Sequence, residues 1–250
     1  MKLRYITCSD PREQNSLESI VNLAKLPHAE VAVQCHPSKM DYAMPRNRWF
    51  DYLVRLALYT DMNLAIHINN EWSKDICANG KIPEIILDWI TLEKATNQPV
   101  IKRIQLNMSE ETAQNIKQHA LAQIIHDFPN QEFILQYNNK TKVAVEKLHQ
   151  TGAKFSLLFD ASGGRGVAPN SWQKPIYDEH PMGYSGGMSP ENVMQNLNDI
   201  NMLVPQNRVI WIDAEGKLKP EGEKYMDVSK AMRYVKLANS WQHYMNNKTR

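Results

Sequence analysis

The chain has little cysteine. Its 250 residues include only Cys8, Cys35 and Cys77, which are too few and too scattered for a disulfide framework. No Cys-x-x-Cys pair or His-x-His spacing is present, and the spacing of Cys35, His36 and His67 is not diagnostic of a ligand set, so we predict no metal. The first ten residues carry charges and no apolar run of signal-peptide length, which favours a cytoplasmic protein.

The sequence also lacks a charge excess of one sign. The formal net charge is +2, which gives no broad electrostatic reason to expect nucleic acid or an anionic membrane as a partner. No run approaches the ~18–20 apolar residues that a membrane span requires. We therefore expect a small-molecule partner, and composition leaves the oligomeric state open.

Glycine is scarce and unevenly placed. Eight of the ten glycines fall within residues 163–222. Glycine loses more backbone entropy on folding than any other residue, so this cluster indicates that the chain must bend unusually there or let something approach closely. The cluster begins in the stretch LLFDASGGRG, three residues after Asp160.

What the sequence does contain is a repeated alternation of short β-type runs and amphipathic helical stretches. The apolar runs cover 4–7, 30–35, 63–68, 101–106, 132–137, 154–159, 182–185 and 208–212. Helical spacing of apolar residues appears at 17–24 and 50–57, and further helices are expected at 83–96, 109–127, 141–151, 189–203 and 227–244.

Eight such units predict an α/β fold, a single (β/α)8 TIM barrel formed as one domain by residues 1–250. A doubly wound open sheet is the alternative. It would usually place its ligand-binding glycines after the first strand, whereas here they follow the sixth to the eighth.

The predicted strands end in polar residues. Active sites of such barrels lie at the carboxyl ends of the strands, so this rim is the candidate site. Asp160 ends the sixth strand, either as a general acid whose pKa is raised or as an acceptor for the amides of its own glycine turn. Cys8 ends the first strand, either as a thiolate base or as a small apolar filler.

The glycines after the last two strands predict a phosphate site. Gly186 and Gly187 precede a helix, and Gly216 and Lys217 follow the eighth strand. Exposed backbone amides and a helix N-terminus attract anions, and the loops after strands seven and eight often bind phosphate in this fold. A tight turn explains the paired glycines equally simply.

Residues 155–235 resemble the C-terminal half of phosphoribosylanthranilate isomerases. The resemblance is carried by LLFDASGGRGVAPNSW, by GYSGGMSPENV and by WIDAEGKLKPEGEKYMDVSKAMRYV, in the family's order and spacing. It implies a (β/α)8 barrel that catalyses an Amadori rearrangement, an aldose–ketose isomerisation of a phosphoribosyl amine in tryptophan biosynthesis, without a cofactor.

The same resemblance implies residue roles. Cys8 would act as the general base and Asp160 as the general acid, while Gly186, Gly187 and Gly216 would hold the phosphate. Further substrate-binding positions implied by the resemblance are Arg46, Gly164, Gly166 and Asp213.

Some positions depart from the family. Asn107 stands where the family has a histidine, and Glu215 places a carboxylate close to the expected phosphate, with Lys217 available to offset its charge. These departures keep an alternative open, a repurposed or non-catalytic barrel that binds a phosphorylated sugar. A third hypothesis is a partner-binding scaffold that uses the aromatic-bearing segment 40–50.

Overall fold

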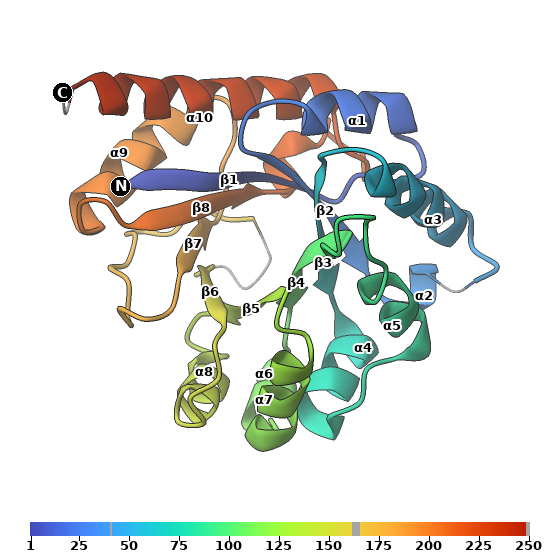
Figure 1. The fold of residues 1–250 in the computed structure, drawn as a ribbon. Coiled ribbons are helices and arrows are strands. Elements are labelled where there is room, and N and C mark those ends of the chain that lie inside the picture. The colour runs from blue at the N-terminus through green and yellow to red at the C-terminus, as the bar shows by residue number, and fades with distance from the viewer. Residues whose placement is uncertain (41, 162–165, 249–250) are drawn as a thin grey trace.

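The computed structural model is a closed barrel of eight parallel strands, in which each strand pairs with its sequence neighbours and β1 pairs with β8 (Figure 1). It describes residues 1–40, 42–161 and 166–248. The strands are β1 (Lys2–Ser9), β2 (Ala29–Cys35), β3 (Asn63–Ile68), β4 (Ile101–Leu106), β5 (Glu132–Tyr137), β6 (Ser156–Phe159), β7 (Met182–Ser185) and β8 (Val209–Ala214).

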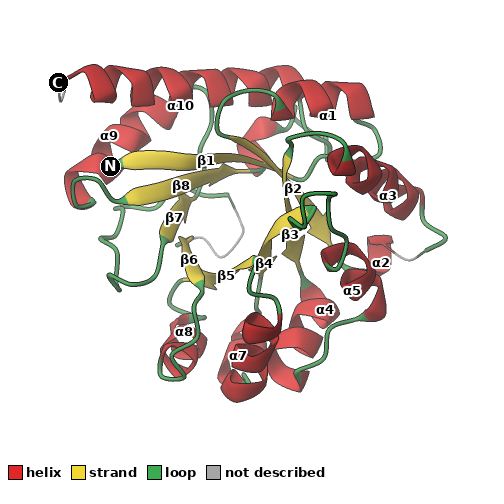
Figure 2. Cartoon of the chain, viewed as in Figure 1, coloured by secondary structure: helices red, strands yellow, loops and turns green. Residues whose placement is uncertain are grey.

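Helices surround this barrel on the outside (Figure 2). They are α1 (Leu17–Ala24), α2 (Pro37–Met40), α3 (Pro45–Leu58), α4 (Asn70–Lys74), the π-helix η1 (Asp75–Asn79), α5 (Glu84–Ile90), α6 (Glu110–Gln114), α7 (Gln118–Asp127), α8 (Lys142–His149), α9 (Val193–Leu203), the 3-10 helix η2 (Gly216–Leu218) and α10 (Val228–Lys248). Among the described residues, no helix combines the length and the apolarity needed to cross a bilayer.

The predicted (β/α)8 barrel is confirmed, and each of the eight predicted runs forms a strand. The expected helix over 109–127 is two helices. Its middle is interrupted because the amide of Lys117 donates to the carbonyl of Cys77 in η1 at 2.9 Å instead of continuing the helix. The helix expected from 189 starts at Val193, because residues 189–192 form a turn. In this turn Asn192 Oδ1 accepts a hydrogen bond from the amide of Ser189, and Ser189 Oγ accepts one from the amide of Glu191.

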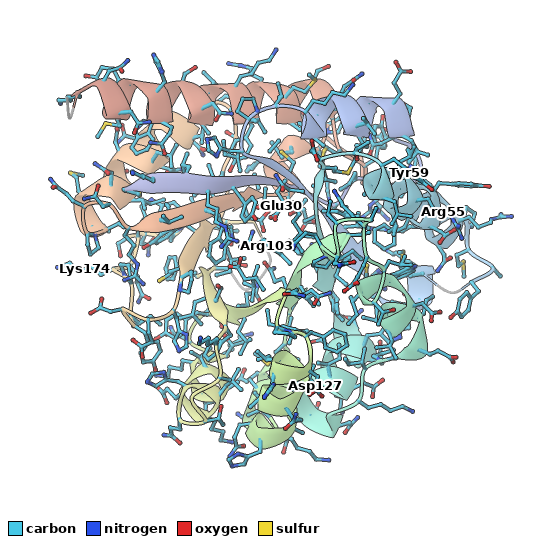
Figure 3. All side chains as sticks on the ribbon, viewed as in Figure 1. Glu30, Arg55, Tyr59, Arg103, Asp127 and Lys174 are labelled. Carbon is cyan, nitrogen blue, oxygen red and sulfur yellow. The ribbon has the colours of Figure 1, made fainter. Side chains whose placement is uncertain are left out.

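Charged and aromatic side chains fill the lower part of the barrel interior, that is, the part nearer the amino ends of the strands. Arg103 of β4 is 1% exposed, and its guanidinium lies 2.7 Å from Glu30 of β2 and 3.3 Å from Glu132 of β5. Its centre lies 4.7 Å from the ring of Tyr5 and 4.3 Å from the ring of Trp211. Strands on opposite sides of a closed barrel meet only through its interior, so these contacts place the cluster inside (Figure 3).

Gly183, one of the eight glycines within residues 163–222, makes room for this interior packing. A Cβ atom at Gly183 of β7 would lie 2.1 Å from the indole of Trp211, which real side chains do not allow. Gly183 therefore leaves the space that the indole occupies beside Arg103. Its role is steric packing within the barrel wall.

We expect Arg103→Met to lower the free energy of unfolding by about 3–5 kcal/mol, because it leaves the buried carboxylate of Glu30 without its cation. Arg55→Met is the matched control. Arg55 forms an exposed pair with Asp51 on α3, and its loss should change the stability very little because solvent screens the pair. Urea unfolding of both variants measures the difference, and equal losses would contradict the role given to Arg103.

Candidate functional site

A cavity of about 230 Å³ opens at the carboxyl ends of strands β2 to β8. It lies where the sequence predicts the site, at the rim on which active sites of this fold are built. The lining residues are mostly polar: Gln34, His67, Gln105, Asn107, Gln136, Leu158, Asp160, Gly166, Ser185, Gly186, Gly187, Met188, Asp213, Ala214, Glu215, Gly216 and Lys217.

Two buried carboxyl groups line this cavity. Asp213, at the end of β8, accepts a hydrogen bond from the hydroxyl of Ser9 at 2.6 Å. Burial raises the pKa of Asp213 to about 7, and the negative charges of Glu215 and other nearby carboxylates add to the rise. Asp160 follows β6 and accepts a hydrogen bond from the side-chain amide of Gln136 at 2.8 Å. Near neutral pH, Asp213 can therefore hold a proton beside a second carboxyl group.

The third carboxylate of the cavity is neutralised by a lysine. The ammonium of Lys219 lies 2.9 Å from Glu215 and 2.8 Å from Asp10, and Gln34 donates to Glu215 at 3.0 Å. Lys217, which the sequence predicts to offset the charge of Glu215, instead lies exposed on the rim of the cavity. Lys219 lies two residues after Lys217 in the loop that follows β8. The turn of η2 directs its side chain toward Glu215, and the sequence alone does not show this turn.

An uncharged network covers the ends of β2, β3 and β4. Asn69 donates to Gln34 at 2.6 Å, Asn107 donates to Asn69 at 2.9 Å, and Gln105 donates to Asn107 at 2.9 Å. Burial lowers the pKa of His67 to about 3, with the charge of Arg103 adding to the effect, so its ring is neutral at physiological pH. Carboxamides both donate and accept hydrogen bonds, which suits a ligand rich in hydroxyl groups.

The glycines after β7 are approached by the chain itself. A Cβ atom at Gly187 would lie 2.7 Å from the backbone nitrogen of Ala168, and one at Gly186 would lie 3.0 Å from the carbonyl oxygen of Val167. Both glycines have positive φ angles, 129° at Gly186 and 60° at Gly187. The paired glycines thus allow segment 166–169 to pack over the cavity. The close approach that the glycine cluster predicts is, at these two positions, an approach of the chain itself.

The same glycines also present bare amides. No hydrogen bond joins the backbone N–H of Gly186, Gly187 or Gly216 to another residue within the described ranges. All three line the cavity, as does Gly166. Gly164, expected at the substrate, lies outside the described residues.

The structure does not bring Cys8 to the cavity. Its side chain is fully buried in the apolar layer outside the strands, while Ser9 and Thr7 on either side face the interior and bond to Asp213 and Glu30. Burial raises the pKa of the Cys8 thiol, and the charge of Asp213 raises it further. The expected thiolate in the pocket is therefore wrong, because the alternation of β1 turns Cys8 outward.

Arg46 is also held away from the cavity. It lies in the first turn of α3, is 4% exposed, and donates to Asp10 at 2.6 Å and to the backbone carbonyl of Gln34 at 2.9 Å. Burial works to raise the pKa of Asp10, but Arg12, Arg46 and Lys219 outweigh it and the net shift is downward. The substrate-binding role expected for Arg46 is not supported, since its guanidinium already binds the carboxylate of Asp10.

Comparison with known proteins adds a likeness of fold. No protein-family model matches the chain, and no curated protein matches it by sequence. Among solved structures, 3-hexulose-6-phosphate synthase from Salmonella typhimurium aligns over 96% of this chain and 100% of that protein, with 12% identity and a TM-score of 0.47. The resemblance of residues 155–235 to phosphoribosylanthranilate isomerases therefore stays a prediction.

The raised pKa of Asp213 predicts a pH-dependent stability. Because the folded protein keeps this proton up to about pH 7 and the unfolded chain loses it near ~3.9, the stabilisation is complete below pH ~4 and is lost as the pH rises to 7. The free energy of unfolding of the wild type, minus that of Asp213→Asn, should fall by about 2 kcal/mol from pH 5 to pH 7.

Urea unfolding of both proteins at pH 5, 6 and 7 measures this difference. The subtraction removes the contribution of His67, whose lowered pKa works in the opposite direction by adding stability as the pH rises toward 6.5. A difference that stays constant across this range would show that Asp213 ionises at an ordinary pKa.

Proposed function

We propose that the cavity binds a small phosphorylated sugar and isomerises it by proton transfer, as an aldose–ketose isomerase of the Amadori type. The observation that carries this proposal is the presence of Asp160 and Asp213, two buried carboxyl groups, in one cavity bordered by bare backbone amides. Acid–base catalysis works best with a group whose pKa lies near the working pH, and Asp213 meets that requirement.

The two ends of the cavity suit the two ends of such a ligand. The amides of Gly186, Gly187 and Gly216, with Lys217 on the rim, would hold the phosphate. The carboxamides of Gln34 and the neighbouring strands would bind the sugar hydroxyls. Because Glu215 is paired with Lys219, the Glu215 carboxylate would repel a phosphate group less strongly.

The chemistry would require one proton donor and one acceptor. Asp213 would give its proton to the ring oxygen as the bond from that oxygen to C1 breaks, while the amine or hydroxyl on C1 supplies the electron pair of the new double bond to C1. Asp160 would then remove the proton from C2, which gives an enolamine or enediol. Return of this proton to C1, and of the C2 hydroxyl proton to Asp213, would give the ketose and restore both groups. The donor role thus moves from Asp160 to Asp213, and the acceptor role moves from Cys8 to Asp160. The reason is that Asp213 holds a proton near neutral pH, whereas Cys8 lies outside the cavity.

Exchange of the C2 proton of ribose 5-phosphate with D2O, followed by NMR, tests these roles directly. We expect the wild type to catalyse exchange, and Asp160→Asn and Asp213→Asn each to slow it by roughly 10²–10⁴-fold. Cys8→Ala is the control, because it removes a thiol that faces away from the cavity, and its rate should stay within about threefold of wild type.

Two results would contradict the assignment. Exchange that survives both aspartate substitutions would remove the proposed acid and base. Loss of exchange in Cys8→Ala at unchanged stability would restore the thiol as the base despite its orientation in the barrel.

The phosphate end is tested by a charge placed at Gly216. A side chain fits there, since an added Cβ meets nothing within 4 Å and the backbone φ is not positive. We expect Gly216→Asp to weaken binding of ribose 5-phosphate by roughly tenfold or more through charge repulsion, and the isosteric Gly216→Asn to weaken it much less. Calorimetric titration with ribose 5-phosphate and with ribose separates the phosphate contribution; equal effects of Asp and Asn would contradict it.

A second candidate function is binding of the same ligand without turnover. The observation that favours it is the absence of Cys8 from the cavity, which removes the base that the family resemblance implies. Phosphate-dependent binding by a wild type that catalyses no C2 exchange would select this function over isomerisation.

A further inference from the structure

A cluster of three metal-ligating side chains lies away from the cavity. His149 is the last residue of α8, and Glu179 and His180 lie in the segment just before β7. The Nδ1 atom of His149 is 3.0 Å from Nε2 of His180 and 3.6 Å from a carboxylate oxygen of Glu179. All three ligand atoms lie within 4.8 Å of one another.

The cluster is held in place by contacts around it. His180 is 4% exposed, its Nδ1 lies 3.0 Å from the carbonyl oxygen of Phe155, and its ring packs on the Phe155 ring at 4.1 Å. The ring of His149 stacks on Tyr177 at 4.1 Å. Arg208 donates to the carbonyls of Tyr177 and His180 at 2.7 and 2.8 Å, which fixes the backbone between them.

This arrangement matches the way proteins prepare a histidine for a metal. A ligating histidine commonly donates its second ring N–H to a carbonyl, which fixes the tautomer and leaves the other nitrogen with its lone pair. The carbonyl of Phe155 has that position relative to His180, which leaves the lone pair of Nε2 for the hydrogen bond with Nδ1 of His149. A metal ion that binds between these nitrogens and Glu179 would displace the proton that the two rings share.

We propose that His149, Glu179 and His180 bind a Zn²⁺ ion that ties the end of α8 to the segment before β7. Zn²⁺ bonds of ~2.0–2.1 Å give tetrahedral edges of about 3.3 Å, close to the 3.0 and 3.6 Å separations from His149. The Glu179 side chain is 59% exposed and can move to shorten its distance to His180, and water would complete the fourth position. Two imidazoles with one carboxylate favour zinc over Mg²⁺ or Ca²⁺, which prefer oxygen ligands.

The site lies at the opposite end of β7 from the cavity. His180 precedes Met182, the first residue of β7, whereas Ser185, its last residue, lines the cavity. Features at the amino ends of barrel strands contribute to stability rather than to catalysis. The ion therefore lies away from the cavity, and its binding is independent of the function proposed there.

The sequence alone predicts no metal, because it contains no closely spaced set of ligands. His149 and His180 are 31 residues apart and meet only after β6 and the β6–β7 connection have formed. Such a site becomes visible only when the fold is known.

Zinc titration of the chelator-treated protein tests the proposal. At pH 7.5 we expect one Zn²⁺ per chain by equilibrium dialysis, an increase in the melting temperature, and a visible absorption band when Co²⁺ replaces Zn²⁺. His149→Gln and Glu179→Gln should each weaken zinc binding tenfold or more and abolish the increase in melting temperature. Both side chains are partly exposed, so these variants should fold, whereas His180→Ala removes a buried ring.

His119→Gln is the matched control. His119 lies exposed on α7, away from the cluster, and its replacement should change neither the stoichiometry nor the affinity. The proposal is overturned if the wild type binds no zinc, because the cluster is then only a hydrogen-bonded histidine pair. It is equally overturned if the double variant His149→Gln, Glu179→Gln binds zinc as the wild type does.

Discussion

The guanidinium of Arg103 is the interaction on which the barrel interior depends. It lies between the carboxylates of Glu30 and Glu132 and between the rings of Tyr5 and Trp211, so one side chain joins opposite walls of the barrel. A buried charge of this kind is stable only while its partners remain, which couples the positions of the strands that carry them. Charges, rather than a purely apolar layer, therefore set the shape of the lower interior.

The same charges act on the cavity above. Arg103 contributes to the lowered pKa of His67, and Glu30 contributes to the raised pKa of Asp213, although burial is the largest cause in both cases. With Glu215 paired to Lys219, the cavity near neutral pH contains a neutral imidazole, a carboxyl group that can hold a proton, and a neutralised carboxylate. This arrangement limits the negative charge that an anionic ligand would meet.

The barrel could be predicted because its signal is local and repeated. Each strand of the wall carries apolar residues, so runs such as 63–68 and 101–106 are visible in the sequence and confirmed at their ends. The orientation of Cys8 was the weaker inference. In β1 the polar residues Thr7 and Ser9 alternate with Ile6 and Cys8, and this pattern indicates which side faces the polar interior.

Other parts of the site depend on contacts between distant segments. Lys219 reaches Asp10 across 209 positions, and Arg46 reaches the same carboxylate from α3. No local pattern encodes such pairings, because each residue alone resembles an ordinary surface charge. The role of Arg46 is predicted from the family resemblance and that of Lys217 from its place after the eighth strand. Only the three-dimensional arrangement shows that Arg46 binds Asp10 and that Lys219 neutralises Glu215.

The described part of the β6–β7 connection contains no helix, yet it still builds part of the rim. In its described part, Trp172 packs edge-to-face on Phe159 and Tyr184, and the Tyr184 hydroxyl donates to the carbonyl of Gln173 at 3.0 Å. Ala168 lies against Gly187, and Arg208 donates a hydrogen bond to the carbonyl of His180 near the start of β7. Aromatic packing and backbone hydrogen bonds thus cover the outer face of β6 and β7 where other units place a helix. Because residues 166–169 pack against Gly186 and Gly187, Gly166 has a defined position at the cavity.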